Sequence, residues 1–280
     1  MIKISYRAHD YGKGTAEEVA KKVASHKLTA VQLVINKCIE GESGLAGTLN
    51  PEKCTSIYNA FKDNGLEISL LGAYFNPVHS DKEKVATLIA KFKEHLKYAK
   101  YFNCKYVGTE TGSFNDDKWT YNPLNRTDEA LAEDIRIFKD LAECAKENDS
   151  YLAIEGAYGH CMYEPEQLKK LFDAINNGHV KIIVDIYNYL DISNYENQID
   201  IFNRAIKIFK DDIVIFHLKD FNVDKENNKL VQCGLGQGIM RWDLFFPIIK
   251  KECPNAYLTF EGIKPEDIDS SIAVVEKYYR

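Results

Sequence analysis

The chain has 280 residues, of which 45% are hydrophobic and 28% charged, and its formal net charge is −6 at pH 7. This composition supplies enough apolar residues for a large core and is typical of a soluble globular protein. The acidic balance argues against a protein that binds duplex DNA, because such a protein needs a basic face to neutralise phosphates.

The seven cysteines are an odd number and contain no C-x-x-C pair. This pattern indicates reduced thiols in a cytosolic protein rather than a disulfide framework. No charged-then-apolar leader opens the chain, and no run approaches the roughly 18 apolar residues of a membrane span. We therefore expect a cytoplasmic protein that has no membrane or nucleic-acid partner.

Short runs rich in β-branched and aromatic residues recur along the whole chain and predict eight strands. These strands are expected at 2–6, 30–35, 66–72, 104–109, 151–155, 180–185, 213–217 and 256–261. The segments between them have apolar residues at helical spacing. These segments predict helices at 15–26, 51–64, 82–101, 128–148, 164–177, 194–210, 243–252 and 265–279.

Capping signals support the helix predictions. Thr127 or Asp128 can cap the helix at 128–148, whose apolar residues return at three- and four-residue steps. Thr15 and Glu18 form the pattern of a capping box before another helix.

Eight strand–helix units of about 35 residues each, without a linker, predict one (β/α)₈ barrel that spans residues 1–280. The strands lack strict alternation, which is typical of a parallel sheet that is buried on both faces. An open doubly wound sheet is the alternative. Its dinucleotide-binding form loses support because no G-x-G-x-x-G follows the first strand.

Four consecutive predicted strands end in side chains that can bind a metal: Glu155, Asp185, His217 and Glu261. In a barrel these ends meet at one mouth, where such folds carry their chemistry. Three carboxylates would repel one another without a cation, so a divalent ion explains their convergence. Oxygen and nitrogen ligands suit Mn²⁺, our first choice, as well as Co²⁺, Mg²⁺ or Zn²⁺.

Three further charged residues are candidates for substrate binding. Glu110 closes the fourth predicted strand and should project toward the mouth, unless it is an ordinary loop carboxylate. Lys219 follows His217 and could neutralise a substrate oxyanion or phosphate, although a surface salt bridge is an equal alternative. Arg7 closes the first strand, where it could bind an anionic group.

Several motifs resemble those of the xylose isomerase-like barrels, which include sugar-phosphate isomerases and epimerases, ketose 3-epimerases, hydroxypyruvate isomerases and inosose-processing enzymes. The matching stretches are "AIEG", "IIVDIYN", "FHLKD" and "LTFEG". The segment "GLGQG" before "IMRWDLFFPIIK" also resembles the glycine-rich segment that precedes the last helix in this family. The resemblance spans nearly the whole chain and is clearest after residue 150. It implies a divalent metal bound by Glu155, Asp185, His217 and Glu261.

One position departs from the family pattern. Many members have a histidine that contacts substrate three residues after the aspartate of the sixth strand, and here that position is Asn188. An amide can donate and accept hydrogen bonds, but it cannot carry a proton or a charge. Either Asn188 positions the substrate, or the catalytic cycle is altered. His160 is the candidate substitute, and a loop histidine at the surface is the alternative.

The resemblance implies a mechanism in which a carboxylate removes a proton from the carbon next to a carbonyl, giving a cis-enediolate. The metal acts as a Lewis acid, and Glu155 and Glu261 give and take the proton. The expected activity is therefore that of a metal-dependent isomerase or epimerase acting on a small sugar or sugar phosphate. The sequence leaves open an inosose-type dehydration, the identity of the sugar and the formation of a homo-oligomer.

Two other classes of function remain as alternatives. The nuclease branch of this fold, the abasic-site endonucleases, uses three zinc ions and more histidines at strand ends than this chain offers. A sugar-binding barrel that has lost its chemistry is the non-enzymatic alternative, for which Asn188 is the one sequence hint.

Overall fold

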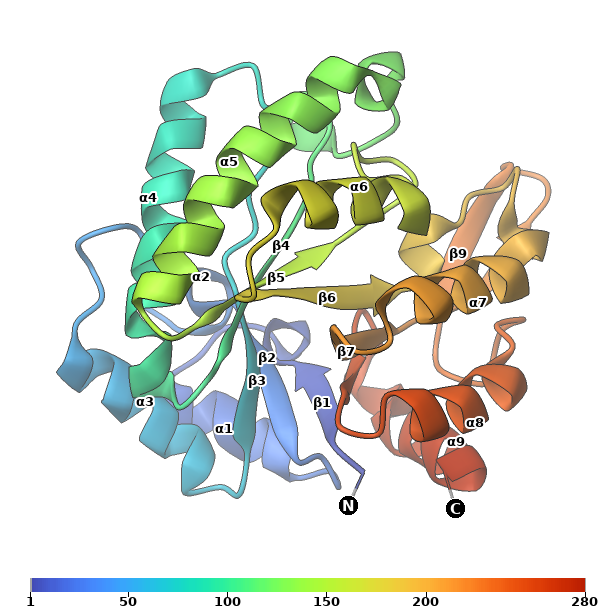
Figure 1. Cartoon of the computed structure of the whole chain (residues 1–280). Coiled ribbons are helices and arrows are strands. Elements are labelled where there is room, and N and C mark those ends of the chain that lie inside the picture. The colour runs from blue at the N-terminus through green and yellow to red at the C-terminus, as the bar shows by residue number, and fades with distance from the viewer. Residues whose placement is uncertain (1, 280) are drawn as a thin grey trace.

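Eight parallel strands close into a barrel in this computed structural model, which describes residues 2–279 (Figure 1). Their order around the barrel is β1-β10-β7-β6-β5-β4-β3-β2. Their bounds are β1 (Ile4–Arg7), β2 (Ala30–Leu33), β3 (Glu67–Gly72), β4 (Tyr106–Glu110), β5 (Tyr151–Glu155), β6 (Val180–Asp185), β7 (Ile213–Leu218) and β10 (Tyr257–Phe260). The predicted (β/α)₈ barrel is confirmed.

Helices surround the barrel and connect its strands (Figure 1). The α-helices of the described residues are α1 (Ala16–Ala24), α2 (Ile35–Cys38), α3 (Pro51–Lys62), α4 (Lys82–Tyr98), α5 (Asp128–Glu147), α6 (Pro165–Ile175), α7 (Gln198–Phe209), α8 (Trp242–Glu252) and α9 (Ile268–Tyr279). Short 3₁₀ turns lie at η1 (Ala8–Tyr11), η2 (Ala99–Phe102), η3 (Asp116–Lys118), η4 (Pro123–Arg126), η5 (Tyr187–Tyr189), η6 (Tyr195–Asn197) and η7 (Pro265–Asp267). None of the helices within residues 2–279 has the length and apolar character needed to cross a membrane.

The predicted caps explain where the helices begin. Thr15 and Glu18 form a complete capping box at α1, so two backbone N–H groups of the first turn are satisfied. At α5 the side chain of Thr127, rather than Asp128, accepts a hydrogen bond from the backbone N–H of Ala130.

The barrel interior is filled by apolar side chains and is not a pore. Leu70, Ala153, Ile183 and Ile215 are fully buried and form a cluster of their own. A Cβ at Gly108 would lie 2.9 Å from Leu70, so glycine is the residue that this close packing admits. This layer is the floor beneath the mouth of the barrel.

The sequence did not predict one hairpin, made of β8 (Asp220–Asp224) and β9 (Lys229–Cys233), which pair antiparallel between β7 and α8. Its strands carry aspartate, asparagine and lysine and are largely half-exposed, so they lack the apolar run by which the barrel strands were recognised. The seven cysteines, all within the described residues, are free thiols, as expected.

A buried carboxylate on α5 has no part in the barrel mouth. Asp134 is fully buried, and among the described residues neither of its carboxylate oxygens has a hydrogen-bond partner. Burial raises its pKa well above the ordinary 3.8, and Glu133 adds to the effect. The folded protein therefore binds a proton at Asp134 over a pH range in which the unfolded chain has lost it.

Asp134→Asn should stabilise the protein at neutral pH. In the wild type, the contribution of Asp134 to the free energy of unfolding is fully present below about pH 4 and is lost as the pH rises through the raised folded pKa. The amide of the variant does not titrate, so its contribution stays constant. Thermal unfolding from pH 4 to pH 8 should show a gain that grows with pH to on the order of 1–3 kcal/mol. Asp140→Asn on the same helix is the control for an exposed side chain. A gain that is constant with pH would contradict the raised pKa.

Candidate active site

The candidate ligands come from the layer of side chains directly above the floor of the barrel. Side chains alternate along a strand, so a residue two positions after an inward-facing one also points inward. Ala153 and Ile183 belong to the floor, and Glu155 and Asp185 follow them by two residues. In the same way His217 follows Ile215 on β7 and pairs in register with Asp185. The two-residue alternation of the strands therefore places these side chains in one layer above the floor of the barrel.

The structure brings three of the predicted ligands into one group. Glu155, Asp185 and His217 each offer an atom within 4.8 Å of the others, and their side chains are almost completely buried. Glu261 lies one residue beyond the end of β10 and outside this group, but its Oε2 is 2.9 Å from the Nδ1 of His217. All four predicted residues therefore meet at His217, with Glu261 on the more open side.

Asn188 holds both buried carboxylates in place. Its side-chain Nδ2 donates to Oε1 of Glu155 at 2.6 Å, and its backbone N–H donates to Oδ1 of Asp185 at 3.0 Å. The other oxygens, Oε2 of Glu155 and Oδ2 of Asp185, lie 3.1 and 4.0 Å from Nδ1 of His217. Each carboxylate thus has one oxygen in a fixed hydrogen bond and directs the other toward the centre.

The tautomer of His217 is set by a glutamine that the sequence analysis missed. Gln32 donates from Nε2 to the hydroxyl of Tyr74 at 2.8 Å, so its oxygen accepts from Nε2 of His217, also at 2.8 Å. The Nδ1 of His217 is consequently left with a lone pair in the neutral ring. A single buried glutamine in the apolar run "AVQLVI" was the available signal.

Two buried polar atoms at this centre have charged groups as their neighbours: Nδ1 of His217 lies beside Glu155 and Glu261, and Oδ2 of Asp185 lies beside Lys219. Burial lowers the pKa of His217, but Glu155 and Glu261 outweigh it and raise the pKa to about 10. Burial also raises the pKa of Asp185 to about 6, although the positive charge of Lys219 acts in the opposite direction. A cation bound at this centre would take the place of the His217 proton and would be held by carboxylate oxygens and an imidazole nitrogen, so the residues fit a divalent metal.

Lys219 is buried within the charge cluster and does not lie on the protein surface. Its Nζ lies 2.9 Å from Oδ2 of Asp185 and 3.0 Å from Oε1 of Glu261, and it donates to Oδ1 of Asn188 at 3.0 Å. These three acceptors match the three protons of the ammonium group. The surface salt bridge considered for this lysine is replaced by a buried one.

Arg7 is also engaged with neighbouring acids. Its Nη1 lies 2.7 Å from Oε1 of Glu261, and its Nη2 lies 2.7 Å from Oδ1 of Asp10. Burial raises the pKa of Glu261, but Lys219 and His217 outweigh it, and Arg7 helps to hold this pKa well below its ordinary range. Glu261 is therefore ionised at neutral pH.

Glu110 faces the same centre from β4, where it pairs in register with Glu155. Enclosure by the barrel raises its pKa to about 8, and the charges of Glu155 and Glu261 contribute. Without a cation, Glu110 is thus largely protonated at pH 7.

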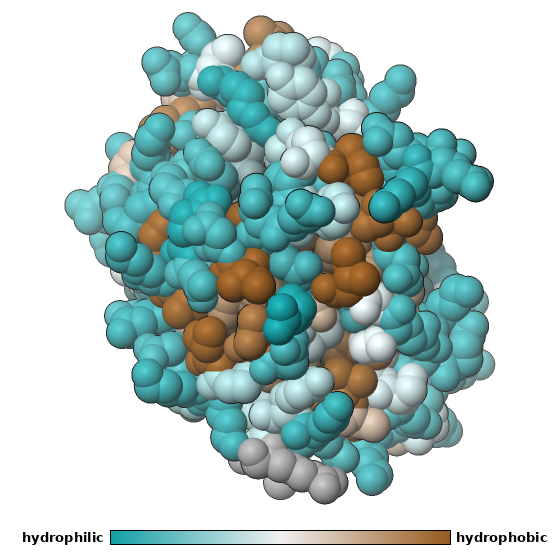
Figure 2. Space-filling model, turned by 90° about the vertical axis from the view of Figure 1, so that its right-hand side faces the viewer, coloured by the Kyte–Doolittle hydropathy of each residue, from teal (hydrophilic) through white to brown (hydrophobic). Residues whose placement is uncertain are grey.

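Two adjoining cavities at the barrel mouth share Glu110 and Trp119 in their walls. The larger one, of about 420 Å³, is bordered by Asn188, His160 and the tip of the β8–β9 hairpin. The smaller one, of about 190 Å³, extends toward β1 and β2. The strands β5 and β6 point toward the right in Figure 1, and Figure 2 views that side, where brown hydrophobic groups lie between hydrophilic ones.

His160 is buried, in contrast to the surface position considered for it. Burial lowers its pKa to about 4, so the ring is neutral at pH 7. It lies against Trp119 with ring centroids 5.5 Å apart, and Arg126 holds its loop by donating to the carbonyls of Tyr158 and His160. His160 thus borders the larger cavity without reaching the ligand group.

The glycine-rich segment "GLGQG" wraps around a buried aspartate. Asp220 accepts hydrogen bonds from the backbone N–H groups of Gly236 and Met240. A Cβ at Gly238 would clash with Oδ1 of Asp220 and with the Phe221 backbone. The segment is therefore a tight turn that closes the hairpin before α8.

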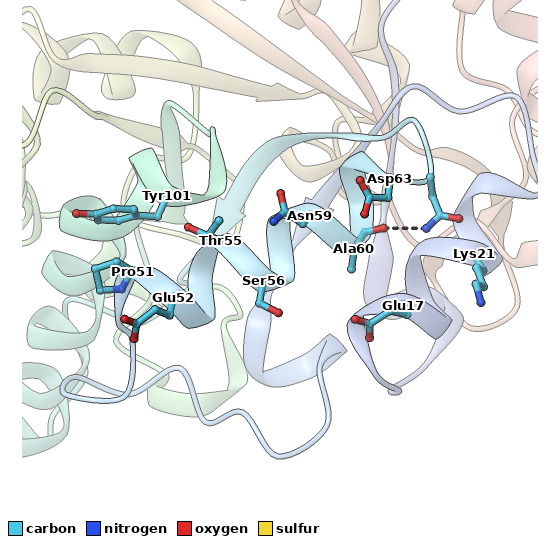
Figure 3. A pocket seen from close by; sticks show the side chains of 11 residues that line it. Glu17, Lys21, Pro51, Glu52, Thr55, Ser56, Asn59, Ala60, Asp63 and Tyr101 are labelled. Carbon is cyan, nitrogen blue, oxygen red and sulfur yellow. Dashed lines mark hydrogen bonds between the residues drawn. The ribbon is translucent and has the colours of Figure 1, made fainter.

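Another cavity, of about 610 Å³, lies outside the barrel against α1 and α3 (Figure 3). Glu17 and Lys21 line it from α1, and Glu52, Thr55 and Asn59 line it from α3. No group of metal-binding side chains was found there among the described residues. We therefore place the candidate active site at the barrel mouth.

Comparison with known proteins gives a family match over most of the chain. The family described as "Xylose isomerase-like TIM barrel" matches residues 20–278. None of the curated proteins matches the chain significantly.

Solved structures of the same fold cover nearly the whole chain. A xylose isomerase-like TIM barrel protein from Mycobacterium smegmatis in complex with magnesium is 12% identical, with a TM-score of 0.75 over 100% of this chain and 98% of that one. A D-tagatose 3-epimerase-like protein is 16% identical, with a TM-score of 0.74 over 99% and 97%. The probable 3-DHS dehydratase AsbF from Bacillus anthracis is 14% identical, with a TM-score of 0.71 over 98% and 99%.

Gln32→Leu should weaken metal binding because the partner that sets the His217 tautomer is lost. Loss of such an outer partner lowers metal affinity by about 10- to 100-fold. Calorimetric titration with Mn²⁺ measures the change, and Gln167→Leu, a buried glutamine on α6, is the control. Equal affinity in the two variants would show that Gln32 does not orient the ligand.

Proposed function

The chain belongs to the xylose isomerase-like TIM barrel family, and from this premise we propose that it is a divalent-metal-dependent isomerase or epimerase of a small sugar or sugar phosphate. The observation that supports the proposal most directly is the convergence of three carboxylates, Glu155, Asp185 and Glu261, on Nδ1 of His217. Mn²⁺ is the first choice of metal, with Co²⁺, Mg²⁺ and Zn²⁺ as alternatives.

The residues that would hold the metal are Glu155, Asp185, His217 and Glu261. When bound, a divalent cation supplies Lewis-acid stabilisation of the negative charge that develops on a carbonyl oxygen.

Two carboxylates are placed to move the proton. Glu155 comes from β5 and Glu261 follows β10, and two other strands, β6 and β7, separate them around the barrel. They approach His217 at 3.1 and 2.9 Å, so a substrate carbon above this centre has a base on either side. Removal by one carboxylate and return by the other gives epimerisation, whereas a single base is sufficient for aldose–ketose isomerisation.

The surrounding residues keep these bases oriented and ionised. Asn188 fixes Glu155, and Arg7 with Lys219 fixes Glu261. In this proposal Asn188 acts by positioning a carboxylate, which explains how an amide can replace the histidine common at this place. Trp119, in the wall of both cavities, would limit the access of water.

A dehydratase is the second candidate, since the same proton removal followed by loss of a hydroxyl would dehydrate the substrate. The similarity in fold to a probable 3-DHS dehydratase favours its inclusion. Product analysis by mass spectrometry separates the two, because dehydration removes one water and isomerisation leaves the mass unchanged.

Two other classes receive less support. An abasic-site endonuclease would need several histidines at the centre, and the metal-capable group found among residues 2–279 contains His217 as its one histidine. A sugar-binding barrel would bind metal and ketose without turnover, and the activity panel described next distinguishes it.

Glu155→Gln and Glu261→Gln should each abolish exchange of the substrate carbon proton with solvent. The amide keeps the shape of the side chain but cannot accept the proton. With the Mn²⁺-loaded protein and a panel of ketoses and inososes in D₂O, we expect a loss of at least about 100-fold in deuterium incorporation. Glu129→Gln, at an exposed position on α5, is the control. Retained incorporation in either variant would remove that residue from its role.

A further inference from the structure

We propose that the smaller cavity at the mouth is a subsite for an anionic group, a carboxylate or a phosphate, that the substrate carries. Lys37 and His9 form the subsite, and Lys91 contacts Asn36, the residue before Lys37. The assignment deepens the proposed function and rests on it for the identity of the ligand as substrate. The shared chemistry is an anionic oxygen group attached to a small sugar-like molecule.

The cavity has the position and size for such a group. Its volume is about 190 Å³, and it runs from His9 and Lys37 on one side to Glu261 and Gln32 on the other. Glu261 and Gln32 both contact His217, so the far side of the cavity borders the proposed centre of reaction. The space is suited to a small charged substituent adjoining the reacting carbon atoms, and too small for a second sugar ring together with its shell of water.

The positive charge on this side is not balanced by the protein. Arg7 is occupied by Asp10 and Glu261, as described above. Lys37, exposed at the end of α2, forms no ion pair within residues 2–279. Glu110 and Glu261, the carboxylates that line the cavity, belong to the cluster around His217. Lys37 is therefore the cation left available to a ligand.

Lys91 adds a second unbalanced charge nearby. It is only 5% exposed, and the partner of its Nζ among the described residues is the amide oxygen of Asn36, at 3.3 Å. This contact places Lys91 beside the residue that precedes Lys37. Burial lowers the pKa of Lys91, and the charge of Lys37 adds to the effect. A buried cation without an acid is costly, and a bound anion would offset that cost.

His9 offers a hydrogen-bonding atom at the same place. Its Nδ1 is buried and has no partner among the described residues. Burial, Arg7 and Lys37 lower its pKa to about 4, so the ring is neutral at pH 7. A neutral imidazole beside the Lys37 ammonium can donate an N–H to an anionic oxygen.

The first test measures anion binding directly in the metal-free protein, so that it does not depend on turnover. Inorganic phosphate and glycolate are titrated separately while the side-chain nitrogen shifts of labelled histidines are followed, with His9 identified from a His9→Gln sample. We expect a saturable shift of the His9 signal for at least one anion, and the response to the two distinguishes a phosphate site from a carboxylate site.

The variant Lys37→Met should weaken this anion binding by about tenfold or more, as expected for the loss of a charge-assisted hydrogen bond. Lys62→Met, an exposed lysine on α3, is the matched control and should bind as the wild type does. Absence of a saturable His9 shift with both anions, or equal affinity in Lys37→Met and wild type, would overturn the subsite.

The second test concerns the substrate. The ratio of kcat/KM for a phosphorylated or carboxylated ketose to that for its neutral counterpart should fall about tenfold in Lys37→Met and stay constant in Lys62→Met. An unchanged ratio in Lys37→Met would overturn the role in substrate selection. Anion binding that depends on Lys37 in a protein that turns over no ketose would contradict the proposed function and leave the anion site standing.

Discussion

Mutual repulsion among carboxylates is the constraint on which the mouth of this barrel depends. Glu155, Asp185 and Glu261 converge on one imidazole, with Glu110 beside them, in a place from which water is largely excluded. Such an arrangement is stable only if cations or protons compensate it. Lys219, Arg7 and the proton of His217 supply that compensation, and a divalent ion could take the place of the His217 proton.

Hydrogen bonds from neighbouring residues orient the carboxylates and the imidazole of this cluster. Asn188 and Arg7 each occupy one oxygen of a carboxylate, and Gln32 occupies one nitrogen of His217. The atoms that remain are those that face the centre. Because the supports come from β1, β2 and the turn after β6, distant parts of the chain must fold correctly before the centre has its geometry. In the proposed enzyme, preorganisation of this kind would let the carboxylates act as bases without further rearrangement.

The barrel and the convergence of the candidate ligands could be predicted because both follow from periodicity. Strand runs and helix faces repeat along the chain, and the last side chains of parallel strands must meet at one mouth. Gln32 was not predicted, because its role depends on a hydrogen bond with His217, 185 residues away. No local sequence pattern indicates such a contact. The β8–β9 hairpin was not predicted, because its polar strands resemble a loop. The burial of His160 was not predicted, because it depends on Trp119 and Arg126 from another segment.

The β8–β9 hairpin borders the larger cavity but pairs only with itself and not with the barrel sheet. Its strand ladder is therefore separate from that of the barrel, to which Gln232 of β9 connects it by donating to the backbone carbonyl of Glu261. Changes in its tip, where Asn228 and Lys229 line the cavity, can alter which molecules fit without disturbing the register of the ligands. In the proposed enzyme, such a separation would let substrate preference diverge during evolution while the reaction itself is preserved.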